Sequence, residues 1–281
     1  MRTARAAGSA RAIRPGMRPE EMVAWACRIL VMHGHGDLTL GHVSARDGAG
    51  VLMKRKGLGL EEVTPADILT IDLEGRLVAG EGMVHLEAPL HTEVYKARPD
   101  VGAVIHTHPV HSTALGATDA RLLFLSHDAL LFPEGIAIFD ETADLVMSAR
   151  AGAAIARTLG DRRVALLRNH GVLVVGKDVR WAVLSALTLE RALHLQAVAT
   201  ALGTPRPIPD AAVRSLHASK YREEFMDEYW GYWVRCVRRT GLDQGMPSAR
   251  ARVGRGTPPA RAGRRRGGTA KGRAGQRGRR I

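Results

Sequence analysis

Apolar residues recur along this chain with two different periods, and each period predicts a type of element. Where they recur every three or four positions, as in residues 178–202, the pattern is typical of an amphipathic helix. Short apolar runs bounded by glycine, proline or aspartate are typical of buried strands. The pattern predicts helices near 19–33, 87–95, 111–115, 141–159, 178–202 and 210–238, and strands near 39–45, 51–54, 68–72, 77–79, 101–108, 122–126, 164–170 and 172–175.

The order of these elements predicts an α/β fold in a single domain. Several strands are joined by tight turns, and Asp47-Gly48 is a typical hairpin signal. We therefore expect a three-layer arrangement, in which helices cover a mixed, largely antiparallel central sheet. The glycine-rich fingerprint of a dinucleotide-binding fold is absent from the sequence. Residues 19–240 form the expected catalytic domain, between a flexible basic N-terminal extension at 1–18 and a disordered Arg/Gly-rich tail at 241–281.

Two histidines stand at the end of the predicted strand 101–108. His106 and His108 are two positions apart, so on a strand both side chains lie on the same face. Pro109 ends the strand, which places the pair at an edge of the sheet. Two imidazoles on one rigid face form half of a divalent metal site. A His-x-His pair also occurs by chance, so the pair needs further ligands before it indicates a metal.

Two further residues can complete such a site. Glu87 lies upstream at the start of a predicted helix, and His170 lies downstream between two predicted strands. Three histidines and one carboxylate suit Zn²⁺, and also Mn²⁺, Fe²⁺ or Co²⁺. If Glu87 does not coordinate permanently, the three histidines leave a position open for a substrate.

These motifs resemble the class II aldolase/adducin family, which includes sugar-phosphate aldolases, epimerases and metal-dependent decarboxylases. The resemblance extends from about residue 19 to about residue 235. It is carried, in chain order, by Gly41-His-Val-Ser44, Glu87 with His91, Arg98-Pro-Asp100, His106-Thr-His108 and Asn169-His170-Gly171. It implies one divalent metal per subunit, bound by the three histidines, with Glu87 as a ligand or as the catalytic acid/base. It also implies the family's fold, a central sheet layered by helices.

The four metal-site residues serve two reactions equally well. Aldol cleavage and decarboxylation both leave electrons on a carbon atom, and a metal that polarises the neighbouring oxygen stabilises the resulting enolate. The resemblance places substrate contacts at Gly41, His42, Ser44, Lys56 and Gly57. Sugar-phosphate members carry small polar residues around the phosphate, whereas this chain has His42, Lys56 and the pair His85-Leu86.

The larger residues in place of the small polar ones favour decarboxylation of a hydroxylated aromatic or heteroaromatic carboxylate. The alternatives are an aldolase that cleaves a sugar or sugar phosphate, and a non-catalytic adducin-like interaction module. His127 is a candidate donor of the proton that replaces CO₂, or else a structural histidine. The resemblance further implies a homotetramer with a C-terminal tyrosine acting across subunits. Tyr221 and Tyr229 are candidates, and helix packing is the alternative for both.

The net charge of +13 belongs to the ends of the chain. Residues 248–281 hold twelve Lys or Arg and residues 1–18 hold five, with no acid in either segment, so the body carries about −4. The charge therefore does not indicate nucleic-acid binding by the domain, and only the tail is a candidate for polyanion binding, with a solvated extension as the alternative. Met17 is a possible alternative start. Two isolated cysteines and no long apolar stretch predict a cytoplasmic protein without a membrane segment.

Overall fold

Eight strands form one sheet, in the order β4-β3-β2-β1-β5-β8-β7-β6. The computed structural model describes residues 17–247. Neighbouring strands are antiparallel except β6 and β7, which are parallel, so the expected mixed and largely antiparallel sheet is confirmed. The strands are β1 His42–Asp47, β2 Gly50–Lys54, β3 Ile68–Ile71, β4 Leu77–Ala79, β5 Ala103–Thr107, β6 Ala137–Phe139, β7 Val164–Leu167 and β8 Gly171–Gly176.

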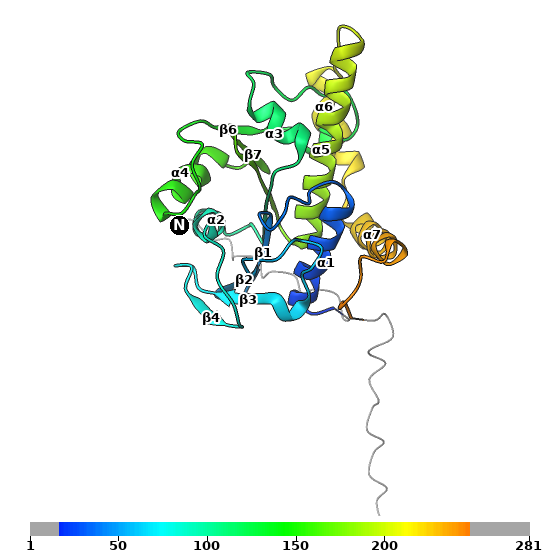
Figure 1. Ribbon diagram of the computed structural model, residues 1–281. Coiled ribbons are helices and arrows are strands. Elements are labelled where there is room, and N and C mark those ends of the chain that lie inside the picture. The colour runs from blue at the N-terminus through cyan, green and yellow to red at the C-terminus, as the bar shows by residue number, and fades with distance from the viewer. Residues whose placement is uncertain (1–16, 248–281) are drawn as a thin grey trace, which may run out of the picture. The chain divides into compact units, whose positions relative to one another are not determined.

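Helices cover both faces of the sheet, as the sequence predicts. α2 and α4 pack together on one face, α1 and α5 cover the other, and α7 packs on α1 (Figure 1). Two apolar clusters, one per face, form the core. The helices in the described part of the chain are α1 Pro19–Met32, α2 Ala88–Ala97, α3 Val110–Gly116, α4 Ala149–Leu159, α5 Val179–Leu202, α6 Asp210–Lys220 and α7 Met226–Thr240.

Strand β5 shows how alternation positions the histidines. Ile105 belongs to the core cluster under α1 and α5, whereas Val104 belongs to the cluster under α2 and α4. His106 is two residues beyond Val104 and therefore shares its face. In the register of the sheet His42 of β1 lies directly opposite His106, so both imidazoles project toward the α2 side.

Near the middle of the chain one predicted strand is wrong, and one predicted helix is confirmed with a later start. Residues 122–126 have an apolar strand pattern, but the Leu123 amide donates to the Gln196 side chain and the Phe124 carbonyl accepts from Ile208. These bonds replace a strand ladder. The helix expected at 141–159 begins only at Ala149, after Ser148 accepts a capping hydrogen bond.

The C-terminal helical segment also differs from the prediction. It is interrupted after Lys220, where α6 ends, and α7 begins only at Met226. The three-residue strand β6 was not predicted, because so short a run carries too weak a period. Most of the expected N-terminal extension and C-terminal tail fall outside the described residues and stay predictions.

The described residues bear on two expectations, one about a membrane segment and one about the two cysteines. Among residues 17–247, no helix is both long enough and apolar enough to cross a bilayer. Cys27 and Cys236 are free, and burial raises the pKa of the Cys27 thiol to about 12. A thiol with that pKa stays protonated, so it makes a poor metal ligand.

Gly176 generates a stability prediction, because β8 approaches α5 closely there. A Cβ atom at this position would overlap the backbone of Ala182 in the first turn of α5. We expect Gly176→Ala to lower the free energy of unfolding by roughly 1–3 kcal/mol, measured by urea denaturation. Gly231→Ala in α7 is the matched control, since it meets only a flexible Arg235 side chain and should not destabilise. Equal effects of the two substitutions would contradict this account.

Candidate metal centre

Three histidines from two parts of the sheet converge at one point. His106 is the last residue but one of β5, His108 lies just beyond the strand, and His170 lies in the turn between β7 and β8. One ring nitrogen from each lies within 4.8 Å of the others. The turn bends sharply at Asn169, which has a positive φ of 57°, a conformation that asparagine tolerates well. The three histidines expected from the sequence are therefore brought together.

The tautomers of two of these rings are fixed by their outer nitrogens. His106 Nδ1 lies 3.1 Å from the Val172 carbonyl oxygen, and His108 Nδ1 lies 3.0 Å from an Asp37 carboxylate oxygen. Both partners accept hydrogen bonds, so each Nδ1 carries a proton and Nε2 is the ring nitrogen left to ligate a metal. This arrangement is typical of histidines that ligate metals.

The two Nε2 atoms face each other. His106 Nε2 and His108 Nε2 are 3.0 Å apart, and two ring nitrogens at that separation need a shared proton or a neighbouring cation. Burial lowers the pKa of His106 well below its usual value, so this ring does not supply the positive charge itself. Burial also lowers the pKa of His170, although Glu87 opposes the shift. The donor set therefore fits a divalent metal ion.

Glu87 stands beside the three histidines but outside bonding distance. It occupies the N-cap position of α2, is 3% exposed, and its carboxylate oxygens lie 3.7 Å from His106 Nε2 and 3.8 Å from His170 Nε2. One oxygen accepts from the Val146 amide at 2.9 Å, and the other lies 3.3 Å from His42 Nε2. Glu87 is thus anchored next to the cluster, where a small shift would make it a fourth ligand.

A second group of buried side chains lies on the other side of Glu87. The rings of His42 and His85 are tilted by 47° with centroids 3.9 Å apart, and together with Glu87 these residues also have the spacing of a metal-binding group. Burial lowers the pKa of His42 well below its usual value, that of His85 to about 4 and that of His91 to about 3. All three rings are therefore neutral near pH 7.

Two of the predicted substrate contacts are used inside the protein. Ser44 is fully buried, and its hydroxyl bonds to His91 Nδ1 at 2.6 Å and to Tyr95 at 2.8 Å. His42 is fully buried too, with both nitrogens bonded. Their side chains lie between β1 and α2, and a direct contact of these two residues with substrate stays a prediction.

The remaining predicted substrate contacts are less constrained. Lys56 is partly buried, and Gly57 is exposed with a φ of +90° that favours glycine. Gly41 is buried where a Cβ would press on Leu60 and Thr107. A contact of these three residues with substrate stays a prediction.

The predicted proton donors lie elsewhere in the chain. His127 is exposed, and the Tyr221 hydroxyl donates to the His127 carbonyl oxygen at 2.8 Å. Burial raises the pKa of Tyr221, so its phenol stays protonated. Within residues 17–247 neither side chain contacts the three-histidine cluster. Their catalytic roles stay predictions, as does the tetramer that would bring them to another subunit's site.

Sequence reasoning missed the residues that orient the ligands. Asp37, Val146 and Val172 hold His108, Glu87 and His106, two of them through backbone groups that no motif reveals. For Asp37 the only signal was an acidic residue in the turn after α1.

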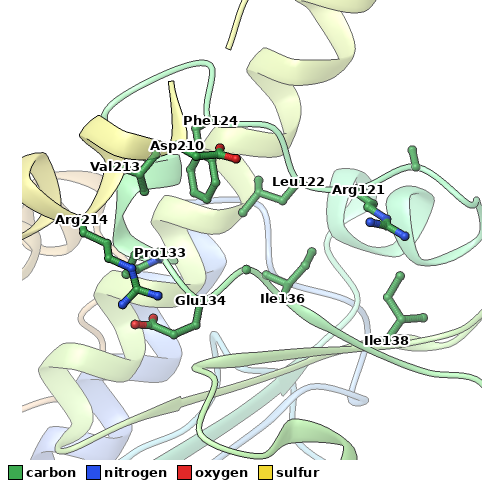
Figure 2. Close-up of a pocket in the computed structure, with 12 residues that line it drawn as sticks. Arg121, Leu122, Phe124, Pro133, Glu134, Ile136, Ile138, Asp210, Val213 and Arg214 are labelled. Atoms are coloured by element: carbon green, nitrogen blue, oxygen red, sulfur yellow. The ribbon is translucent and has the colours of Figure 1, made fainter. Parts of the chain in front are cut away.

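A separate cavity lies away from this cluster. It has a volume of about 530 Å³ and is lined by residues of the 120–124 loop, the segment around β6 and the start of α6 (Figure 2). Arg214 and Glu134 lie on one side of it, and Leu122 and Ile136 supply apolar walls. Its lining includes none of the histidines described above, so it is not part of the candidate metal centre.

Comparison with known proteins identifies the family that the motifs resemble. A profile of the Class II Aldolase and Adducin N-terminal domain matches residues 21–197. Decarboxylase NovR of Streptomyces niveus is 36% identical over 154 residues, which are 54% of this chain and 57% of NovR, so the match spans little more than half of that relative. A 3,4-dihydroxyphthalate decarboxylase of Arthrobacter keyseri is 34% identical, covering 70% of this chain and 85% of the relative. An L-fuculose phosphate aldolase of Methanococcus maripaludis is 29% identical, covering 60% and 91%.

Solved structures agree on the fold. An aldolase II superfamily protein from Pseudomonas syringae superposes with a TM-score of 0.74 at 25% identity, covering 83% of this chain and 97% of that one. An L-fuculose 1-phosphate aldolase from Glaciozyma antarctica gives a TM-score of 0.70 at 23% identity, covering 79% and 89%. The second likeness shows the fold alone.

Metal content tests the cluster directly. The double substitution His106→Ala with His108→Ala removes both facing Nε2 atoms, so bound metal should fall from about one ion per chain to nearly none, measured by elemental analysis after reconstitution with Zn²⁺ or Mn²⁺. His217→Ala on α6 is the control, because this histidine bonds to the Leu130 carbonyl. A wild-type chain that binds no metal, or a double variant that keeps it, would contradict the assignment.

The buried His35 predicts a loss of stability in acid. Burial lowers the pKa of His35 to about 4, and its Nδ1 bonds to the Thr107 hydroxyl. Below the unfolded pKa near ~6.5 only the unfolded chain takes up this proton, so the contribution to stability falls as pH falls. Between pH 7 and pH 5 in a chelator, wild type should lose roughly 2 kcal/mol more unfolding free energy than His35→Gln. Parallel losses in urea titrations would refute this.

Proposed function

The chain belongs to the class II aldolase and adducin family, and from this premise we propose that it is a metal-dependent carbon–carbon lyase that decarboxylates a hydroxylated aromatic or heteroaromatic carboxylate. The main support is the pair of facing Nε2 atoms of His106 and His108, with His170 and Glu87 beside them. These four residues would hold one divalent ion. When bound, the ion supplies Lewis-acid polarisation of a substrate oxygen next to the bond that breaks.

Glu87 is the candidate for proton transfer. A carboxylate beside the cluster can accept the proton of the substrate hydroxyl and return it to the ring carbon. The bond between that carbon and the carboxylate group breaks, its electron pair stays on the carbon, and CO₂ leaves. One proton from solvent then restores the hydroxyl. The bonds from Val146 and His42 hold the Glu87 carboxylate in place for this exchange.

The surroundings of Glu87 suit a carboxylate better than a sugar phosphate. Positions that the family resemblance assigns to phosphate binding are filled here by the adjacent, tilted rings of His42 and His85. The His42 nitrogens are bonded within the protein, and His85 Nδ1 faces the Glu87 amide at 3.4 Å. The ammonium groups of Lys54 and Lys56 both lie near enough to lower the pKa of His85, and ammonium groups suit a carboxylate.

Exposed apolar side chains flank the residues that contact the cluster. Asp37, Glu87, Val146 and His108 each have a large exposed apolar residue within two positions in the sequence, namely Leu38, Leu86, Val110, Leu145 or Met147. Apolar side chains near the site would suit a flat aromatic ring, which gains from burial, better than a hydrated sugar phosphate.

Two other functions are alternatives. Aldol cleavage of a sugar phosphate is supported by the 29% identical L-fuculose phosphate aldolase, which the match covers to 91%. A non-catalytic adducin-like module is opposed by the convergence of three histidines, because a scaffold has no need of facing ring nitrogens.

A substrate comparison separates these functions. The metal-loaded protein should release CO₂ from hydroxyaromatic carboxylates such as 3,4-dihydroxyphthalate and leave L-fuculose 1-phosphate intact, with CO₂ and aldehyde measured in the same samples. Aldehyde and dihydroxyacetone phosphate from the sugar phosphate would reverse the order of the two lyase activities. No turnover of either class by a metal-loaded chain would favour the interaction module.

Glu87→Gln is the control for this comparison. It keeps the shape of the side chain but removes the group that exchanges the proton, so kcat should fall by roughly 10²–10⁴-fold with bound metal retained. Activity that survives unchanged would point to a contaminating enzyme or to another base.

A further inference from the structure

Five buried side chains form a continuous hydrogen-bonded chain that ends at Glu87. Glu87, His91 and Tyr95 are four residues apart, so they form one stripe along α2 that begins at its N-cap. His42 and Ser44 are two residues apart and share one face of β1. The stripe and the strand interlock in the order Tyr95, Ser44, His91, His42, Glu87.

The contacts along this chain are short. Tyr95 and Ser44 hydroxyls are 2.8 Å apart, Ser44 lies 2.6 Å from His91 Nδ1, His91 Nε2 lies 2.6 Å from His42 Nδ1, and His42 Nε2 lies 3.3 Å from Glu87. All five side chains are at most 3% exposed, so water does not replace these bonds.

With Glu87 as an acceptor, only one assignment of protons satisfies every contact. The Glu87 carboxylate accepts, so His42 Nε2 must donate, and a neutral His42 must then accept at Nδ1. His91 Nε2 therefore donates, and His91 Nδ1 accepts from the Ser44 hydroxyl. The Ser44 hydroxyl donates its one proton to His91, so the Tyr95 hydroxyl must donate to Ser44. The reverse order would place the lone pair of His42 against the carboxylate at 3.3 Å.

We infer that Tyr95, Ser44 and His91 are positioning residues that act through His42 on Glu87. Together they fix His42 as an Nε2–H donor and hold the Glu87 carboxylate between His42 and the Val146 amide, facing the three histidines. They do not touch the cluster themselves. The catalytic consequence rests on the proposed function, whereas the proton assignment does not.

The same proton assignment argues against metal binding by the second group, His42, His85 and Glu87. His42, His85 and Glu87 have suitable spacing, but a ring nitrogen that carries a proton cannot ligate. His42 Nε2 carries one, and Nδ1 of His85 accepts from the Glu87 amide. This leaves too few free donors, so within the described residues the cluster of His106, His108 and His170 takes the metal.

Histidine nitrogen NMR tests the assignment without any substrate. On ¹⁵N-histidine-labelled metal-free protein, His42 and His91 should both be neutral Nε2–H tautomers at pH 7, with signals assigned through the His42→Gln and His91→Gln variants. A protonated Nδ1 on either ring would overturn the inference. So would about two tightly bound metal ions per chain in the wild type.

A matched pair of variants tests the positioning role. His91→Phe keeps a ring of similar size and removes both bonds, so kcat on the hydroxyaromatic carboxylate should fall roughly 10–100-fold with KM and metal affinity little changed. His91→Gln offers an amide N–H to His42 and an oxygen to Ser44, so it should recover most of the activity. A purely structural His91 would instead change stability in both variants and leave kcat the same.

Hydroxyl variants supply a second comparison that does not depend on the ring. Ser44→Ala should lower kcat, whereas Ser185→Ala should not, because the equally buried Ser185 hydroxyl has no hydrogen-bond partner among residues 17–247. Equal effects of the two variants would contradict the inference. If no substrate is turned over, the proposed function fails, and the tautomers measured by NMR still decide the proton assignment.

Discussion

The candidate site depends on the hydrogen bonds that the Nδ1 atoms of His106 and His108 make to the protein. Because Val172 and Asp37 accept from Nδ1 of His106 and His108, both rings must direct Nε2 inward, where the two atoms lie 3.0 Å apart. Such a pair is unfavourable by itself and favourable around a cation. The end of β5, the turn at β7–β8 and the loop after α1 are arranged around this requirement.

Glu87 joins the metal centre to the interior of the domain. It occupies the N-cap position of α2, so its position follows from where that helix begins, and its two oxygens bond to the Val146 backbone and to His42. The histidines around it are kept neutral by burial, which lowers their pKa values. Neutral rings can serve either as ligands or as directed donors. The same burial costs stability in acid, because the unfolded chain takes up protons that the folded chain refuses.

The fold does not separate decarboxylation from aldol cleavage, since relatives of both kinds share it. The difference must lie in side chains around the common metal site. In this chain the paired rings of His42 and His85 and the ammonium groups of Lys54 and Lys56 support the proposal of a flat carboxylate. The same pair of rings lies against Glu87, and His42 makes one of the bonds that orient its carboxylate.

The sequence by itself determined what depends on local periodicity. It predicted the layered fold, the shared face of His106 and His108, and the resemblance that assigned Glu87 and His170. The tertiary structure alone decided the rest, because it depends on which distant segments pack together. The sequence did not show that Ser44 points into the protein or that Asp37 and backbone groups orient the ligands. It also did not show that the backbone of residues 122–126 bonds to a side chain and not to a neighbouring strand. Hydrogen bonds between distant segments leave no periodic pattern in a single sequence, whereas faces of strands and helices do.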